Sequence, residues 1–328
     1  MPPHIMICNV SITNIRFNNA RLFDTMCLEI LGGLSMSRRI ANFLFVLATI
    51  SWASSYLFTK FAVNELQPFT LIAMRFSIAF IVTFALFYRK LLPVSKDTLK
   101  ASAVLGALMC LMFTIFNVVL KTVNPSTAGF LLATTVVFVP LIMMLFTREL
   151  PQRQIKIGTI VTFTGLSIFM FNGSLFIDSG VILCLVTALL FASHLVVNNR
   201  FTKSHDALQL GVFQLGFASL FGGIFMLLFE QPHVPTSKLG WVSIIVLAVI
   251  CSAFGFVVQS VAQKYTSAEE TGFILALEPV FSAFFAYLAL GEVLANREWI
   301  GALIVLIGVF IASHQPKVAP ISHTISDS

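Results

Sequence analysis

Charged side chains are scarce in this sequence: they make up 10% of its 328 residues, whereas hydrophobic residues make up 58%. A soluble globular domain carries roughly a quarter charged residues. The few charges stand in short clusters between apolar runs, which excludes a water-soluble domain with a polar surface and indicates one bundle in a lipid bilayer. The formal charge of +6 lies mostly at the ends of these runs rather than along one soluble face, so we expect no nucleic-acid partner.

Sequence motifs of catalysis and cofactor binding are also absent. The five cysteines are scattered without metal-ligand spacing, so they predict packing residues, no bound metal and no cofactor. No G-x-x-x-x-G-K-[ST] stretch occurs, which argues against an ATP-driven pump, and no H-E-x-x-H or G-x-S-x-G occurs, which argues against an intramembrane protease or hydrolase. We therefore expect a protein that is not an enzyme. The alternative, a membrane-embedded enzyme acting on lipid-linked substrates, requires acids or histidines clustered at one membrane face, and the sequence shows no such cluster.

Apolar segments of about 20 residues, long enough to cross roughly 30 Å of hydrocarbon, recur along the chain with short polar joints. A backbone in hydrocarbon must satisfy its own NH and CO groups, and continuous apolar runs lack the alternation of barrel strands, so each run is predicted to be a helix. The expected fold is an all-α membrane protein with ten transmembrane helices, near residues 43–63, 68–88, 101–120, 126–146, 157–173, 180–199, 208–229, 241–262, 271–290 and 299–314.

Basic residues are distributed unequally between the two sets of joints. With both termini inside, most lysines and arginines fall on the cytoplasmic side, and the other side keeps Lys60, Lys121, Lys238 and Arg297. This bias predicts a multi-pass plasma-membrane protein with both termini in the cytoplasm.

Two tails flank the predicted helices. Residues 1–39 and 315–328 are expected to be cytoplasmic tails that contribute no spanning helix. The first of them lacks the continuous apolar core and small-residue cleavage site of a secretory signal. Met36 and the two arginines behind it lead into the first apolar run like a fresh start, so whether the native protein begins at Met1 or at Met36 stays open.

The two halves of the chain resemble each other. A shift of 143 residues aligns Lys121 with Lys264, Gly129-Phe130 with Gly272-Phe273, and Gly165 with Gly308 without a gap. The start of each half matches more loosely, with Trp52 over Phe191 at a shift of 139 and Lys60 over Arg200 at 140. We predict repeats at 40–173 and 174–314. Five helices in each repeat force the second to enter from the opposite face, an inverted arrangement that many transporters use.

Four short motifs carry a family resemblance: Trp52-Ala53-Ser54-Ser55, Pro68 followed by Arg75, Leu277-Glu278-Pro279-Val280, and Gly291-Glu292. Their order within a duplicated ten-helix frame resembles the EamA-type transporters of the drug/metabolite transporter superfamily. The resemblance implies a secondary transporter that moves an amino acid or related small metabolite across the plasma membrane, in the direction of export. The first half departs from the pattern at Thr135-Val136, where the second has Glu278-Pro279.

Glu278 and Arg75 are the charged candidates for a substrate or proton pathway. Glu278 lies inside the run 271–290, where an acid is costly, so it is a candidate for proton coupling, or else a neutral residue bonded to a neighbouring helix. Arg75 lies seven residues after Pro68 and either holds an anionic group or extends to the membrane interface. At 1.5 Å per residue, Arg75 lies roughly 10 Å from the outer end of its helix and Glu278 roughly 10 Å from the inner end of its own. This difference in depth disfavours a direct pair between them.

The uncharged candidates are polar or aromatic residues inside predicted helices. Trp52, Ser55 and Tyr56 share one helical face and form either a substrate-facing wall or packing. His194 is either a proton relay or a neutral interhelical bond. The amides Asn117, Gln214 and Gln259 are either ligands or interhelical glue.

Overall fold

The computed structural model describes residues 36–148, 150, 153–170, 179–275, 277–291 and 295–313. Residues 1–35 and 314–328, which make up nearly all of the two predicted tails, lie outside this description. The helical body begins at Arg38, and its described residues form helices joined by short turns, without a strand.

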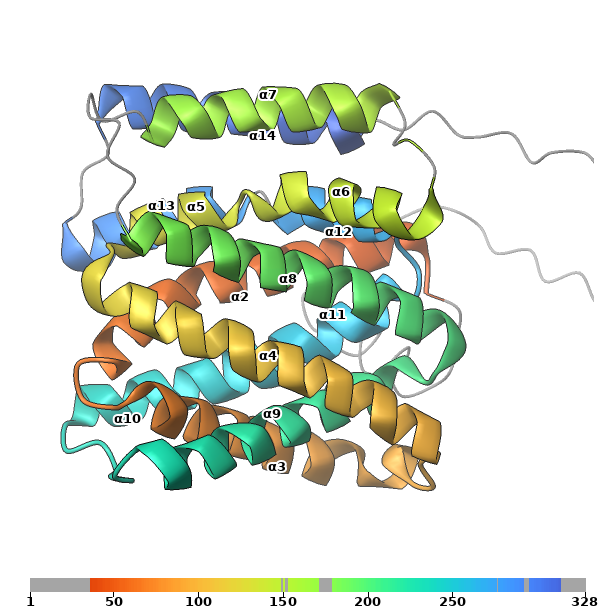
Figure 1. Cartoon of the computed structure of the whole chain (residues 1–328), viewed down its shortest axis with the longest axis vertical. Coiled ribbons are helices and arrows are strands. Elements are labelled where there is room, and N and C mark those ends of the chain that lie inside the picture. The colour runs from red at the N-terminus through yellow and green to blue at the C-terminus, as the bar shows by residue number, and fades with distance from the viewer. Residues whose placement is uncertain are drawn as a thin grey trace, which may run out of the picture. The chain divides into compact units, whose positions relative to one another are not determined.

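Helices of the first half follow the predicted runs closely. They are α2 (Arg38–Ala62), α3 (Pro68–Leu91), α4 (Lys96–Thr122), α5 (Pro125–Leu132), α6 (Thr135–Thr147) and α7 (Arg153–Met170). The second half contains α8 (Ser179–Ser204), α9 (Ala207–Phe229), α10 (Lys238–Val246), the π-helical segment η1 (Leu247–Phe254), α11 (Gly255–Gln263), α12 (Ala268–Leu275), α13 (Glu278–Leu290) and α14 (Asn296–Ser313). Figure 1 shows how these helices are arranged.

Local sequence determines where several helices begin. Pro68 occupies the first turn of α3, where its missing NH removes no helical hydrogen bond. Ser95 caps α4 by accepting a 3.0 Å bond from the backbone NH of Thr98. Asp206 caps α9 in the same way, with a 2.8 Å bond from the NH of Gln209. These caps satisfy NH groups that have no partner within the helix.

Eight candidate membrane spans are long and apolar enough to cross a bilayer: Arg38–Ala62, Pro68–Leu91, Lys96–Thr122, Pro125–Phe146, Ser179–Ser204, Ala207–Phe229, Lys238–Gln263 and Glu270–Leu290. Each overlaps one of the predicted runs. The remaining two runs overlap α7 and α14, which have 18 residues each and are not among the eight. The fold is therefore that of an all-helical membrane protein, and the predicted total of ten spans goes beyond what the described residues establish.

Two of the spans are broken at equivalent points, one in each half. The breaks lie between α5 and α6 and between α12 and α13, and the first residues after them, Thr135 and Glu278, are 143 positions apart. Across the halves, α5 packs on α13 and α6 on α12, with Phe130 and Phe273 in one buried apolar cluster. Broken helices at the interface of two repeats are the elements from which many transporters build their binding sites.

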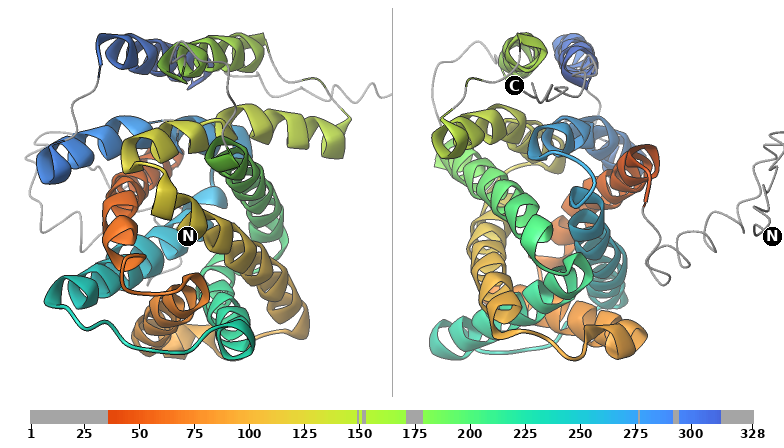
Figure 2. Two further views of the ribbon diagram at one scale, coloured as in Figure 1. Left: turned by 60° about the vertical axis from the view of Figure 1, so that its left-hand side comes forward. Right: turned by 90° about the vertical axis from the view of Figure 1, so that its right-hand side faces the viewer.

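The helices α7 and α14 lie side by side (Figures 1 and 2), and glycines form the contact between them. A Cβ atom at Gly165 would lie 2.7 Å from the backbone nitrogen of Val305, and one at Gly308 would lie 2.7 Å from that of Thr162. A larger side chain at either glycine would push the backbones apart, as in other membrane helix pairs built on small residues. Because Gly165 and Gly308 match under the shift of 143, equivalent faces of the two halves meet here.

A lysine near the end of the first helix of each half holds another helix end. The Lys60 ammonium on α2 donates to the backbone oxygen of Leu120 at 2.8 Å, at the end of α4. The Lys203 ammonium on α8 donates to that of Gln263 at 3.0 Å, at the end of α11. Donor and acceptor are each 143 positions apart between the halves. The structure thus makes Lys203, rather than Arg200, the equivalent of Lys60, and the shift of 143 extends further toward the start of each half than the sequence comparison suggested.

Two acids tie the α2–α3 loop to the segment between α9 and α10. The Glu230 carboxylate accepts bonds of 2.8 and 2.7 Å from the backbone NH groups of Phe69 and Thr70, at the start of α3. The Glu65 carboxylate accepts bonds of 2.9 and 3.1 Å from the NH groups of Thr236 and Ser237, at the start of α10. The acid of each loop therefore caps the helix that begins after the other loop: Glu230 caps α3, and Glu65 caps α10.

His233 joins the same two loops through both ring nitrogens. Its Nε2 lies 2.7 Å from the backbone oxygen of Glu65, and its Nδ1 lies 3.0 Å from that of Gln231. Carbonyl oxygens only accept, so both nitrogens carry a proton and the ring is cationic in this arrangement. The bond to Gln231, then the bond to Glu65, raise the pKa of His233, as does the nearby Glu230 charge. Bonds from Ser237 lower the pKa of Glu65, which favours the charged carboxylate.

The contacts of His233 predict a loop connection that depends on pH. A group whose pKa is raised by folding stabilises the folded arrangement below its unfolded pKa and loses that effect as the pH rises through the folded value, which here lies above 6.5. We expect a spin label on Val234→Cys, a position that is 60% exposed, to become more mobile as the pH rises through that range. His233→Gln is the control and should show the mobile spectrum at every pH. A pH response that persists in this variant would contradict the assignment.

Candidate functional site

A small cavity lies where helices of both halves meet. Helices α2, α4 and α5 of the first half contribute Trp52, Ser55, Tyr56, Met112, Phe113, Phe116 and Leu132. Helices α8, α11 and α13 of the second half contribute Thr187, Phe191, Phe256 and Glu278. A relative motion of the two halves would therefore change the walls of this cavity.

Six aromatic rings form a connected chain around the cavity. In order along the chain they are Phe191, Trp52, Phe256, Phe113, Phe116 and Tyr56, with neighbouring ring centres 5.1 to 6.1 Å apart. Four of the five contacts are edge-to-face, the arrangement that aromatic quadrupoles favour. Since the rings come from four helices of both halves, the chain couples the position of each helix to the shape of the cavity.

The position of Trp52 depends on the π-helical segment η1. The Trp52 Nε1 donates a 2.8 Å bond to the backbone oxygen of Cys251, and Ser51 Oγ donates a 2.9 Å bond to that of Ile250. The indole lies against Gly255, where a Cβ atom would be 2.4 Å from Nε1. Single π-helical turns are frequent at functional sites, and here the turn presents carbonyls to side chains of α2.

Glu278 is the acidic residue of the cavity wall. It is the first residue of α13, directly after the break from α12, and 7% of its surface is exposed. The Tyr56 hydroxyl lies in the same cavity wall and is buried without a hydrogen-bond partner. No basic side chain pairs with Glu278 among the described residues. The acid therefore faces the cavity without a countercharge.

Arg75 lies behind the aromatic wall rather than in it. Only 2% of its surface is exposed, so it does not extend to the membrane interface. Its Nε donates a 2.6 Å bond to Ser252 Oγ of η1, and its guanidinium lies 4.4 Å from the ring centre of Phe113. The Nη2 atom is buried without a hydrogen-bond partner. Arg75 and Glu278 form no ion pair, and Phe113 contacts the first and lines the cavity with the second.

The histidine and two of the three amides belong to a second buried group. His194 Nε2 bonds Gln214 Oε1 at 2.9 Å, and Gln214 Nε2 donates to Ser260 Oγ at 3.1 Å. The chain continues from Ser260 to Asn198 at 3.2 Å and from Asn198 to Gln263, which also accepts from Gln259. These side chains join α8, α9 and α11, and His194 reaches the cavity wall only through its contact with the ring of Phe256.

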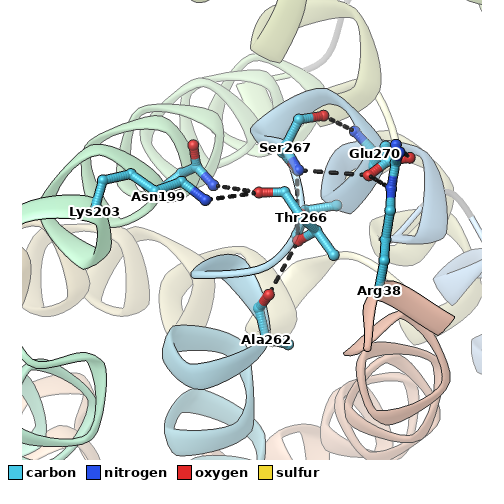
Figure 3. A network of polar contacts seen from close by, with 8 residues as sticks. Arg38, Asn199, Lys203, Ala262, Thr266, Ser267 and Glu270 are labelled. Atoms are coloured by element: carbon cyan, nitrogen blue, oxygen red, sulfur yellow. Dashed lines mark hydrogen bonds and ion pairs between the residues drawn. The ribbon is translucent and has the colours of Figure 1, made fainter. Parts of the chain in front are cut away.

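The backbone oxygen of Gln263 accepts bonds from Asn199 and Lys203. These two residues also take part in the contacts that Figure 3 shows. Asn199 Nδ2 and Lys203 Nζ both donate to the backbone oxygen of Thr266, at 3.0 and 3.3 Å. On the next helix, Glu270 pairs with Arg38 at the start of α2. The first residue of the helical body is therefore anchored to the start of α12.

Asn117, the third amide, lies apart from both groups. Its Nδ2 donates a 3.2 Å bond to the backbone oxygen of Pro68, and its Oδ1 is buried without a partner. The contact holds α4 against the start of α3. Of the predicted site residues, the structure thus brings Trp52, Ser55, Tyr56 and Glu278 into one cavity and places the others around it.

Several cavity residues were not predicted. Phe113 and Phe256 are 143 positions apart, so they match once the shift of 143 is extended toward the start of each half, and in the structure their rings are in contact at 5.9 Å. Phe191, which the looser alignment placed opposite Trp52, contacts that residue at 5.9 Å. Matched aromatic positions in the two halves were therefore the signal that sequence reasoning missed.

The chain has two equivalent helical halves, with broken helices between them and a cavity with an acid that both halves line. These features define a class: a two-repeat membrane protein built around a shared site. The family model described as the EamA-like transporter family matches residues 39–171 and again 178–314. The chain belongs to the EamA-like transporter family.

Relatives of known sequence agree with this assignment. A protein of Archaeoglobus fulgidus named as an uncharacterized transporter is 27% identical over 288 residues, which are 86% of this chain and 88% of the relative. A second uncharacterized transporter of that organism is 28% identical over 282 residues, covering 83% and 96% of the two chains. A solved crystal structure, 17% identical, has a TM-score of 0.69 and covers 84% of this chain and 97% of its own, which shows a shared fold.

Proposed function

We propose that this protein is a secondary transporter that moves a small metabolite across the plasma membrane by alternating access, and that it acts as a carrier rather than as an enzyme. The observation that carries the proposal is the cavity, because both halves line it and a buried acid faces it that has no countercharge in the described part of the chain. Two equivalent helix breaks, before Thr135 and before Glu278, lie at the interface of the repeats, where many transporters build their sites.

In this proposal Glu278 binds and releases the coupling proton. An acid inside a membrane protein is costly, so its presence in the wall of a cavity lined by both halves calls for a functional reason. The Tyr56 hydroxyl lines the same cavity and is buried without a hydrogen-bond partner, so it is available to donate to the ionised acid. The cargo is an amino acid or a related compound, and the direction is export, as the family resemblance implies.

The proposal includes ten membrane crossings, with α7 and α14 as the fifth helix of each half, and cytoplasmic termini. Ten crossings place the loop at Glu65 outside and the joint at Lys96 inside, in agreement with the distribution of basic residues. Membrane-impermeant thiol labelling of Glu65→Cys and Lys96→Cys in intact cells tests this orientation. We expect the reagent to label Glu65→Cys and not Lys96→Cys. Labelling of Lys96→Cys alone would show the opposite orientation.

Transport in proteoliposomes tests the proposed function directly. Purified protein is reconstituted, a panel of labelled amino acids, amines and other small metabolites is supplied, and uptake is followed with and without an imposed pH gradient. We expect accumulation of at least one compound that collapses when a protonophore is added. Absence of gradient-driven movement for the whole panel, with correctly inserted protein, would count against proton-coupled transport.

A further inference from the structure

The cavity wall carries charge of one sign only. Glu278 is its acidic residue, and among the residues that the structure describes no lysine, arginine or histidine lines it. Arg75, the arginine that contacts the wall from behind, is separated from the cavity by the ring of Phe113 and already donates to Ser252. A bound molecule therefore meets a carboxylate in a low-dielectric setting and no group of opposite charge. Such a setting favours a cation strongly, because charges interact more strongly there than in water.

The rest of the wall suits the same ligand. The chain of six aromatic rings includes Trp52, the side chain that binds cations best through its face, and Tyr56. The Trp52 NH already donates to the backbone oxygen of Cys251. The indole therefore offers a bound molecule its aromatic ring rather than a hydrogen-bond donor. Aromatic walls with one acid are the chemistry by which proteins recognise ammonium groups.

The described cavity wall offers no cationic side chain that could pair with a free carboxylate on the cargo. In a zwitterion such as an amino acid, the ammonium group would sit at Glu278, and the carboxylate would stay in the same cavity with hydroxyls such as those of Ser55 and Tyr56 but without a cation. Burial of an unpaired charge is unfavourable even when neutral donors are near. The cavity therefore distinguishes an amine from the amino acid of the same side chain.

We infer that the cargo is a small organic amine cation without a free carboxylate, held by Glu278 and by the aromatic chain that contains Trp52 and Phe256. The inference rests on the proposed function, because it takes the cavity as the place where the cargo binds. It narrows the proposed cargo from amino acids and related compounds to the amines among them, including amino-acid derivatives whose carboxylate is masked.

Three probes of matched size test the inference by binding: n-butylamine, norvaline, which is the same amine with a carboxylate, and n-butanol, which lacks the charge. Trp241→Phe and Trp299→Phe leave Trp52 as the sole tryptophan, and its fluorescence reports occupancy of the cavity in the full-length protein in nanodiscs. Both replaced side chains are exposed, at 40% and 61%, so their removal leaves the cavity intact. We expect n-butylamine to bind at least tenfold more tightly than norvaline or n-butanol.

Variants separate the charge from the rings. Glu278→Gln should abolish the preference for n-butylamine over n-butanol, and Phe256→Leu should weaken n-butylamine binding several-fold. Asp97→Asn removes an acid that is exposed on α4 and should leave all three affinities unchanged. Norvaline binding as tight as n-butylamine binding, equal affinity for amine and alcohol, or no binding of n-butylamine to protein that melts cooperatively would each overturn the inference.

Transport distinguishes this inference from the proposed function. Gradient-driven uptake of a free amino acid without uptake of its amine would leave the transporter proposal standing and overturn amine selectivity. Selective amine binding without transport of any amine would support the recognition chemistry and count against the transporter proposal.

Discussion

Replacement of Glu278 by glutamine is expected to lower proton-driven transport by roughly a hundredfold or more, the lower range of what a positioned proton-transfer group contributes. Glutamine keeps the size and hydrogen-bonding capacity of the acid and removes its titration. Because no basic side chain of the described helices pairs with Glu278, the substitution breaks no ion pair there. It also removes an ionisable group whose charged form costs about 2.5 to 3.5 kcal/mol at the centre of a membrane helix. The variant should therefore insert and fold normally.

The measurement combines transport in proteoliposomes with thermal unfolding of the purified variant. We expect an unchanged or higher melting temperature and loss of the accumulation that a pH gradient drives. Some exchange of cargo should remain, and it should not depend on pH. Thr135→Val is the matched control, because Thr135 occupies the equivalent position after the helix break of the first half, where its hydroxyl donates to Ala188 at 3.3 Å. Gradient-driven transport by Glu278→Gln with normal pH dependence would leave Glu278 as a structural residue.

Helix positions could be predicted because membrane thickness and hydrophobicity determine them. The run expected at 208–229 corresponds to α9 (Ala207–Phe229), and that expected at 180–199 lies within α8 (Ser179–Ser204). Apolar composition indicates where a chain is in hydrocarbon and does not indicate whether the helix inside is continuous. The break before Thr135 contains no glycine or proline, so nothing in the local sequence signalled it.

Site residues were predictable when they lie on one helix and not when they depend on packing between helices. Trp52, Ser55 and Tyr56 share a face of α2 by simple spacing, and the structure places all three in the cavity wall. Phe113 and Phe256 join them only because α4 and α11 approach α2 from different parts of the chain. The burial of Arg75 likewise depends on η1, whose π-helical turn presents Ser252 to it.

Arg75→Met is expected to keep or raise the stability of the protein while lowering transport about tenfold. The guanidinium is buried with Nη2 unsatisfied and pairs with no carboxylate among the described side chains, so its desolvation is poorly compensated. Apolar residues of similar volume commonly replace buried charged groups without loss of stability. Function should nevertheless suffer, because the guanidinium over Phe113 holds that ring in the cavity wall and a flexible methionine does not orient it.

Two further variants separate the charge of Arg75 from its position. Arg75→Lys keeps the charge and loses the planar group that stacks on Phe113 and bonds Ser252, so it should transport poorly and also melt lower. Ser252→Ala leaves Nε of Arg75 without its 2.6 Å acceptor and should destabilise the protein by about 1 to 3 kcal/mol. Thermal unfolding in nanodiscs and transport in proteoliposomes measure the two effects independently. A lowered melting temperature with unimpaired transport in Arg75→Met would instead make Arg75 a structural residue that connects α3 to η1.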